Sequence, residues 1–246
     1  MDVMPSPSTV SLERLVPNAL DDADATGKET LALHMARYRF AAGFVKGGRV
    51  LDCACGVGYG TAMLAGAEQA PEQVLGVDID AAAVEYAARS YASERIRFLQ
   101  SDGCKLEDSV GFDTIVSLET VEHVPEPSAL LRNFWRLLRP GGTLIASVPV
   151  TPSVDVNPYH LHDFTSKSFR SLGADLGLEE IDSLFQVQPF SPLKIVRGQE
   201  IRLEDMRKNM AGYYFRHPAA FSKRLISTVV DGFCNKYLTI AWSKPA

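Results

Sequence analysis

The sequence is poor in cysteine, with four residues in 246, and it contains no CxxC pair. Cysteines this few and this irregularly spaced exclude a disulfide framework. Cys53 and Cys55 are two residues apart in an apolar stretch, so we expect them to pack on one side of a strand rather than to bind metal. A reducing cytoplasm is therefore the expected location of the protein.

Long apolar runs and a surplus of positive charge are also absent. No window approaches the ~20 apolar residues of a membrane-spanning helix, and the first residues lack the apolar core of about 7–15 residues that marks a secretory signal. We therefore expect no membrane association. The net charge of −5 disfavours nucleic acid as a partner. The content of 46% hydrophobic and 22% charged residues is typical of an ordinary globular domain.

Strands and helices alternate along the middle of the chain. Apolar stretches predict strands at 49–54, 73–78, 96–100, 112–118 and 143–148, and helices at 61–67, 81–93 and 127–138. This alternation predicts right-handed crossovers and a mostly parallel, doubly wound α/β sheet. A helix at 166–176 and two more strands, around 180–187 and at 237–242, complete the predicted elements of the sheet region.

The ends of the chain differ from this middle. Residues 1–27 are rich in Pro, Ser and Asp and are expected to form a loose arm, whereas 28–45 have the apolar spacing of a helix. We interpret residues 1–48 as an arm and helix that cover the ligand site, and 49–246 as the main domain.

A long insertion at about 188–236 separates the last two predicted strands. Helices are expected within it near 200–210 and 219–231. Insertions of this length are usually functional. We therefore expect a helical substrate lid.

A glycine-rich turn follows the first predicted strand, where residues 50–60 read VLDCACGVGYG. Glycines permit tight turning and close backbone approach, and the amides that open the next helix are free to donate hydrogen bonds. Asp78 ends the second predicted strand, where a carboxylate can accept hydrogen bonds from both hydroxyls of a ribose. The spacing GxGxG departs from the GxGxxG of nicotinamide-binding domains, so hydride transfer is the weaker interpretation.

Residues 50–60 and 76–80 resemble the first two motifs of class I S-adenosylmethionine-dependent methyltransferases, and 101–103, 112–117 and 138–142 resemble later ones. The resemblance covers 49–148. It implies an enzyme of EC 2.1.1.- with a Rossmann-like, mostly parallel seven-stranded sheet whose last strand is antiparallel. It also implies S-adenosyl-L-methionine as cofactor, bound by Tyr38, Asp52, Cys53, Ala54, Gly56, Gly58, Asp78, Ile79, Asp102, Gly103 and Glu119.

Some of these assignments have structural alternatives. Asp78 is also placed to cap the next helix, and Ile79 and Tyr38 are also suited to packing in the core. A purely structural role is likewise open for Asp102. Ala54 stands where the family usually has glycine, which places the contact at that position in doubt.

A cluster of acidic and histidine residues lies past the fourth predicted strand, at the edge where open α/β sheets bind ligands. In a helical turn, Glu119 would face Glu122 and His123. A later loop carries His160 and His162. Two carboxylates and one or two imidazoles suit a divalent cation.

Both segments resemble the ExxEH and histidine loops of ubiquinone-pathway O-methyltransferases and small-RNA 2′-O-methyltransferases, which place a divalent ion beside the methylated hydroxyl. The resemblance implies Mg²⁺ or another divalent cation bound by Glu119, Glu122, His123 and His160, with His123 and His160 catalytic. Three alternatives stay open: a metal-free base role for His123 or a loop histidine, a structural role, and His162 in place of His160.

The predicted lid has a local excess of positive charge. Residues 194–224 contain eight basic and three acidic side chains, with Tyr213, Tyr214 and Phe215 among them. This pattern favours a phosphorylated or nucleotide-linked acceptor, although a solvated helical face would look the same. The leading function is O-methylation of a polar small molecule such as a sugar, a nucleotide-linked sugar or a catechol. N-methylation and a non-catalytic, cofactor-binding regulatory protein are the alternatives, and a homodimer is compatible with each.

Overall fold

The computed structural model describes residues 10–11, 14–15, 25–190 and 207–246. Its centre is a seven-stranded sheet of order β5-β4-β3-β6-β7-β9-β8, in which six strands share one direction and β9 runs antiparallel to both its neighbours. The predicted fold class is confirmed. The strands are β3 (Arg49–Cys53), β4 (Gln73–Asp78), β5 (Ile96–Gln100), β6 (Phe112–Leu118), β7 (Leu138–Pro149), β8 (Glu179–Pro189) and β9 (Cys234–Ser243).

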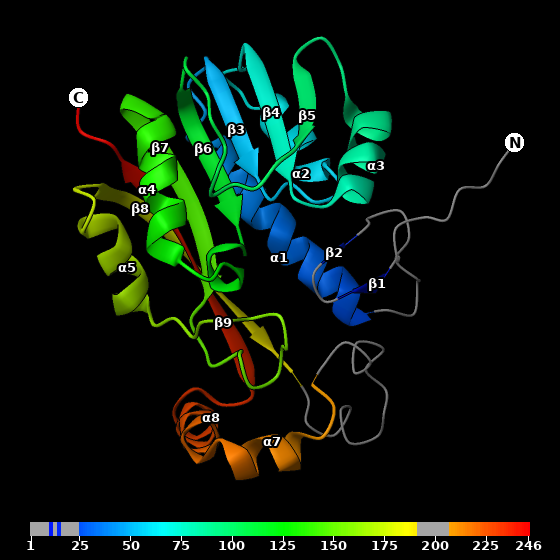
Figure 1. Cartoon of the computed structure of the whole chain (residues 1–246), viewed down its shortest axis with the longest axis vertical. Coiled ribbons are helices and arrows are strands. Elements are labelled where there is room, and N and C mark those ends of the chain that lie inside the picture. Colours follow the sequence, from blue (N-terminus) through cyan, green and yellow to red (C-terminus); the bar gives the residue numbers. More distant parts are fainter. Residues whose placement is uncertain (1–9, 12–13, 16–24, 191–206) are drawn as a thin grey trace, which may run out of the picture.

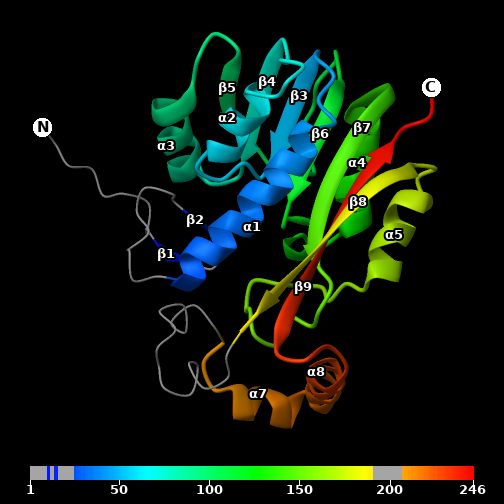
Figure 2. The same cartoon turned by 180° about the vertical axis from the view of Figure 1, so that it is seen from behind.

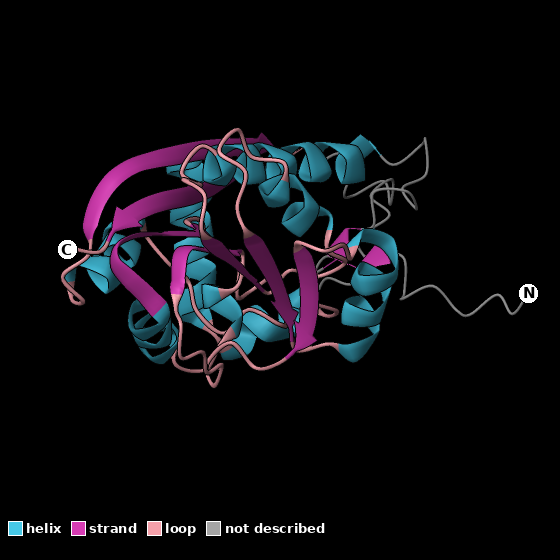
Figure 3. Ribbon diagram, turned by 90° about the horizontal axis from the view of Figure 1, so that it is seen from above, coloured by secondary structure: helices cyan, strands magenta, loops and turns pink. Residues whose placement is uncertain are grey.

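Helices cover both faces of the sheet. One face carries α1 (Ala25–Ala42) and α2 (Tyr59–Ala65), and the other carries α4 (Pro127–Leu137) and α5 (Ser166–Ala174), as Figures 1 and 2 show. Helix α3 (Ala81–Tyr91) packs on β4 and β5. Seen from above, the sheet lies between these helical layers (Figure 3).

Two cores follow from the alternation of side chains along the buried strands. Leu51 and Leu144 enter the core beneath α4 and α5, whereas their neighbours Val50 and Ile145 enter the core beneath α1 and α2. Because both faces are covered, buried parallel strands are apolar almost throughout. This is why the predicted bounds of β4 and β6 agree with the structure to the residue.

Strand β7 begins five residues before the strand predicted at 143–148. It therefore includes residues 138–142, which resemble a family motif. The pairing of β7 with β6 shifts there, because Leu138 lies opposite Phe112 and Thr143 opposite Thr114. Gly141 has a φ of +73°, which lets the chain bulge without leaving the sheet.

The ends of the chain are described in part. The loose arm predicted at 1–27 lies mostly outside the described residues, which do include β1 (Val10–Ser11) paired antiparallel with β2 (Arg14–Leu15). The helix predicted at 219–231 is confirmed as α8 (Pro218–Asp231). The helix predicted near 200–210 lies largely outside the described residues, and α7 (Met210–Arg216) begins where it was expected to end. Across the described ranges, none of the helices is long and apolar enough to cross a membrane.

The contact between α1 and α2 depends on a glycine. A Cβ on Gly60 would overlap the ring of Tyr38, which is buried and hydrogen-bonded to Asp52. We expect Gly60→Ala to lower the free energy of unfolding by about 1–3 kcal/mol, the usual cost of overpacking a core, as measured by urea unfolding.

Gly66 provides the matched control at the other end of α2. A Cβ there would meet its nearest atoms at an ordinary 3.5 Å, and its φ is −91°. Gly66→Ala should therefore leave stability within about 1 kcal/mol of wild type. Equal losses in the two variants would contradict the packing argument.

Candidate functional site

A cavity of about 1020 Å³ opens at the carboxyl ends of β3, β4 and β6, between α1 and the α7–α8 pair. In Figure 1 the parallel strands end on the side that α7 and α8 occupy. Nine of the eleven predicted cofactor residues line this cavity: Tyr38, Cys53, Ala54, Gly56, Asp78, Ile79, Asp102, Gly103 and Glu119. The four predicted metal ligands also line it: Glu119, Glu122, His123 and His160.

Asp78 organises the glycine turn from the end of β4. Its Oδ2 accepts a hydrogen bond from the Gly56 amide at 2.8 Å, and its Oδ1 accepts one from the Asp80 amide at 2.9 Å. The capping of α3 is done by Asp80, whose Oδ1 accepts from the Ala83 amide. Each Asp78 oxygen keeps a second lone pair, so the carboxylate can accept further hydrogen bonds from a ligand in the cavity.

The backbone of the turn faces open space. Ala54 and Gly56 have φ values of +63° and +53°, a region that costs a residue with a Cβ roughly 1 kcal/mol. Ala54 thus adopts the conformation for which the family usually has glycine. A Cβ on Gly56 would meet no heavy atom within 4 Å, and Ile79 beside the turn is 70% exposed. Core packing is therefore not the role of Ile79.

Gly58 and Asp52, the other two predicted cofactor residues, do not line the cavity. A Cβ on Gly58 would lie 2.6 Å from that of Ala87, so this glycine lets α2 approach α3. Asp52 is fully buried and accepts hydrogen bonds from Thr61 Oγ1 at 2.6 Å and from Tyr38 Oη at 3.2 Å. These residues support the turn from behind.

Asp52 is expected to make stability depend on pH. Burial raises the pKa of its carboxyl to about 7, against the opposing effect of its hydrogen bonds from Thr61 and Tyr38. The unfolded chain releases this proton near pH 4, so the folded protein binds more protons between roughly pH 4 and 7. The free energy of unfolding therefore falls as the pH rises through this window.

Asp52→Asn should remove the contribution of this carboxyl to the pH dependence of the free energy of unfolding. Urea unfolding of the wild type and the variant across the window measures it, and the free energy of unfolding of the wild type should fall relative to that of the variant as the pH rises. Parallel pH profiles would contradict the buried, protonated carboxyl.

Glu119 follows β6 in the left-handed region, with a φ of +50°. Ser147 Oγ donates to Glu119 Oε1 at 2.7 Å, and Nη1 of the buried Arg37 lies 3.6 Å from the same oxygen. Arg37 also donates through Nε to Gln186 Oε1 at 2.7 Å and lies over the Tyr237 ring. A guanidinium from α1 thus balances the charge of Glu119 at the cavity wall.

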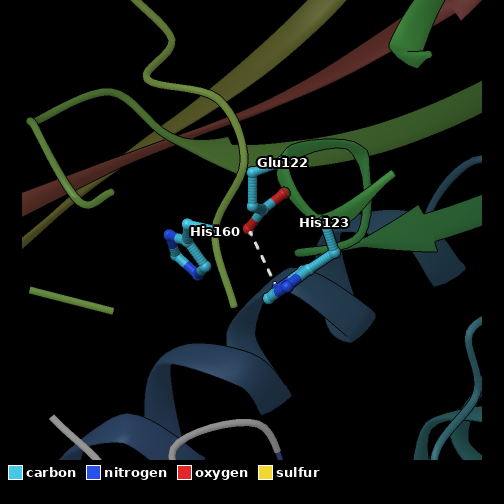
Figure 4. A group of neighbouring side chains, drawn as sticks. All are labelled: Glu122, His123 and His160. Atoms are coloured by element: carbon cyan, nitrogen blue, oxygen red, sulfur yellow. Dashed lines mark ion pairs between the residues drawn. The ribbon is translucent and has the colours of Figure 1, made fainter. Parts of the chain in front are cut away.

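Glu122, His123 and His160 form a compact group, with one potential ligand atom of each within 4.8 Å of the others. Figure 4 shows Glu122 between the two imidazoles. Glu122 is fully buried, its Oε1 lies 4.0 Å from His123 Nε2, and the two imidazole rings meet edge to face at 4.6 Å. Burial and the neighbouring His123 lower the pKa of His160 to about 3, so its ring is neutral at pH 7.

Glu119, the fourth predicted ligand, lies outside this group. The prediction assumed a helical turn from Glu119 onward, but the turn is a short 3₁₀ helix, η2 (Val121–His123), that begins two residues later. The two loop histidines, His160 and His162, lie in different places. His160 Nδ1 lies 2.7 Å from Ser153 Oγ inside the group, whereas His162 Nε2 lies 3.0 Å from the Val124 carbonyl oxygen and does not line the cavity.

Four of the five described cations of the basic segment make internal contacts: Arg207, Arg216, Lys223 and Arg224. Arg224 donates two hydrogen bonds to the buried carboxylate of Asp155, at 2.8 and 2.6 Å. Arg207 donates to the carbonyl oxygens of Val154 and Asp155. Of the five cations that the structure describes in this segment, Arg224 alone lines the cavity, and Asp155 neutralises its charge. These residues give no support to a phosphate site, and Lys194, Arg197 and Arg202 lie outside the described residues.

Comparison with known proteins agrees with the geometry of the turn. Residues 51–146 match the methyltransferase domain family. A probable S-adenosylmethionine-dependent methyltransferase of Mycolicibacterium smegmatis is 26% identical over 189 residues, 74% of this chain and 70% of that protein. Phosphoethanolamine N-methyltransferase 3 of Arabidopsis thaliana is 27% identical over 206 residues, 78% of this chain but 39% of the plant protein. Residues 51–146 form a methyltransferase domain, and the chain is similar to S-adenosylmethionine-dependent methyltransferases over most of its length.

A solved structure extends the likeness to the fold. N-methyltransferase NodS of Bradyrhizobium japonicum, in complex with S-adenosyl-L-homocysteine, superposes with a TM-score of 0.60 and 15% identity over 92% of this chain and 90% of that one. The donor set of this methyltransferase fits the family's cofactor. Asp78 offers two acceptor oxygens for hydroxyls, Gly56 leaves its backbone open, and Ile79 presents an apolar side chain beside them.

Three residues of the methyltransferase's site were not predicted from the sequence. Arg37, Ser147 and Ser153 position Glu119 and His160 through the contacts given above. Arg37 stands next to Tyr38 on α1, so the prediction of a covering helix placed it near the site, but its partner is 82 residues away in sequence. Ser147 lies near the end of β7 and Ser153 in the loop that follows. Serine is common at such positions, so the sequence around them gave no sign of a role in the site.

Proposed function

We propose that this methyltransferase transfers a methyl group from S-adenosylmethionine to a hydroxyl of a polar small molecule. The observation that carries the proposal is that Glu122, His123 and His160 face the same cavity as the turn of Gly56 and Asp78. A hydroxyl must lose its proton as it attacks, and a positioned base contributes about 10²–10⁴ in rate to such a step.

Different residues of the cavity would bind the cofactor and accept the proton of the hydroxyl. The cofactor supplies a methyl group on a positively charged sulfur, which needs no covalent help from the protein. The glycine turn and Asp78 would hold the methyl donor in a fixed orientation relative to the acceptor. Orientation of this kind is worth effective molarities of order 10⁵–10⁸ M. The imidazole pair of His123 and His160 receives the proton of the acceptor hydroxyl, rather than His160 alone, because burial lowers the pKa of the His160 ring. The buried carboxylate of Glu122 stabilises the charge that results on the imidazole pair.

As an alternative to the base role of the histidines, we propose that Glu122, His123 and His160 hold a divalent cation, which would then activate the hydroxyl in their place. One carboxylate and two imidazoles give a mixed oxygen and nitrogen donor set, which suits Mn²⁺ or Zn²⁺ better than Mg²⁺. A cation at this position would polarise the acceptor hydroxyl and lower its pKa. Glu119 takes no part, because Ser147 and Arg37 hold its carboxylate elsewhere.

Chelation tests the cation. We expect exhaustive treatment with EDTA to abolish transfer, because the hydroxyl would lose its Lewis acid, and we expect added Mn²⁺ to restore it better than Mg²⁺. The readout is the initial rate of transfer before and after metal is returned. Full activity after chelation would overturn the metal proposal and leave the assignment as a methyltransferase unchanged.

N-methylation is the second candidate function. It is favoured by the names of two relatives, the plant phosphoethanolamine N-methyltransferase and NodS. An amine needs less help from a base than a hydroxyl, so an N-methyltransferase would have less use for the histidine pair. A regulatory protein that binds the cofactor without turnover is the third.

Calorimetry with S-adenosylmethionine and S-adenosylhomocysteine, followed by a panel of hydroxylated and amine acceptors, separates these functions. Mass spectrometry locates the added methyl group on each product. Methylated hydroxyls support the proposal, methylated amines alone support the second candidate, and binding without any product supports the third. An absence of binding to both ligands would overturn the cofactor assignment.

A further inference from the structure

Helix α8 has its polar side turned in and its apolar side turned out. Arg224 and Thr228 line the cavity, and Asp231 accepts a hydrogen bond from Lys236 of β9. Every residue of α7 and α8 is at least partly exposed. The outward side of α8 carries large aliphatic side chains: Leu225, Ile226, Val229 and Val230, exposed by 51, 63, 78 and 74%.

These four residues, which we call the apolar face of α8, recur at spacings of one, three and four and therefore form one continuous stripe. A surface helix normally buries such a stripe against its own domain. Phe233, just beyond the helix, is also half exposed. A contiguous exposed apolar patch of this kind marks an interaction surface.

The positive charge of the segment that contains this face argues against a second copy of the chain as the partner. The described segment 207–233 contains five cationic side chains and one acidic side chain, in a chain whose net charge is −5. Asp155 neutralises Arg224, and Lys223 Nζ lies 3.5 Å from Asp163 Oδ2, but the side chains of Lys208, Arg216 and Lys223 are exposed. In a symmetric pairing of two copies through α8, these cationic segments would face each other, because such interfaces place the same patch on both partners. Like charges brought together in this way oppose association.

We propose that the apolar face of α8 inserts into the surface of an anionic lipid bilayer. An amphipathic helix with aliphatic residues on one side and cations beside them lies in the plane of the interface, held by apolar burial and by attraction to acidic head groups. Lys208, Arg216 and Lys223 meet the head groups. The helix does not cross the bilayer. This inference replaces the sequence-based expectation of no membrane association, and it does not rest on the proposed function.

Cosedimentation of the whole chain with lipid vesicles tests the inference. We expect binding to phosphatidylcholine vesicles that contain phosphatidylserine, and much weaker binding to phosphatidylcholine alone. Val229→Asp should lower the partition coefficient by about tenfold or more, since a buried valine and one charge near an anionic surface are together worth more than 1.4 kcal/mol.

Val110→Asp is the matched control, because Val110 is 58% exposed but lies away from α8, in the loop before β6. It should bind vesicles like the wild type. Calorimetry with S-adenosylhomocysteine checks that both variants keep the cofactor site. No binding to acidic vesicles, or equal losses in the two variants, would overturn the inference. So would a dimer, seen by light scattering, that Val229→Asp dissociates.

Discussion

Replacing His160 with alanine is expected to lower the rate of methyl transfer by about 10²–10⁴-fold, the contribution of a positioned base. Both imidazoles of the Glu122–His123–His160 group have a partner on Nδ1: Ser153 Oγ at 2.7 Å for His160 and the Tyr159 carbonyl oxygen at 3.2 Å for His123. The loss should appear in the rate constant at saturating acceptor. The affinity for S-adenosylmethionine should stay near that of the wild type, because the glycine turn and Asp78 are unchanged.

His162→Ala is the control, two residues along the same loop. His162 contacts the Val124 carbonyl oxygen and does not line the cavity, so its removal should change the rate by less than about tenfold, the equivalent of one modest hydrogen bond. If His162→Ala is the more damaging variant, or if both leave the rate intact, the assignment of the acceptor chemistry to the group around Glu122 is wrong.

Asp78→Ala is expected to weaken the binding of S-adenosylmethionine by about 100-fold or more. Hydrogen bonds to a charged group are worth about 1.5–3 kcal/mol each, and two of them to hydroxyls of the ligand would be lost. The variant also leaves the amides of Gly56 and Asp80 without their present acceptor, which loosens the turn. Calorimetric titration with S-adenosylhomocysteine measures the change without requiring an acceptor.

Asp80→Ala separates ligand contact from helix capping. Asp80 accepts a hydrogen bond from the Ala83 amide at the start of α3 and does not line the cavity. Its removal should lower the free energy of unfolding by about 0.5–2 kcal/mol and leave the affinity nearly unchanged. A comparable loss of affinity in both variants would show that Asp78 acts only by supporting the loop.

Much of the fold was predictable because buried parallel strands carry a strong local signal. The strands β4 and β6 are bounded by polar residues and turns, and their limits followed from apolar content alone. The glycine turn and Asp78 were predictable for a related reason, since a chain reversal at a strand end needs specific residue types at fixed spacing. The apolar strands and the glycine turn with Asp78 each depend on residues that lie no more than about thirty positions apart in the sequence.

The acceptor side of the site was only partly predictable. Glu122, His123 and His160 were identified by residue type, but whether Glu119 joined them depended on a single left-handed residue at the end of β6. That conformation is set by Ser147 on the neighbouring strand, 28 residues away. The surroundings of the basic segment could not be predicted for a similar reason, because the carboxylate that neutralises Arg224, Asp155, lies 69 residues earlier.

The antiparallel direction of β9 bears on how this protein could change its acceptor. Pro189 at the end of β8 lies opposite Cys234 at the start of β9, so the intervening segment leaves the sheet and returns to it at one point. A segment anchored in this way can be lengthened, shortened or exchanged as one piece without altering the order of the strands. Evolution, or an engineer grafting a different loop between 189 and 234, could alter which molecule is methylated while the cofactor-binding half stays as it is.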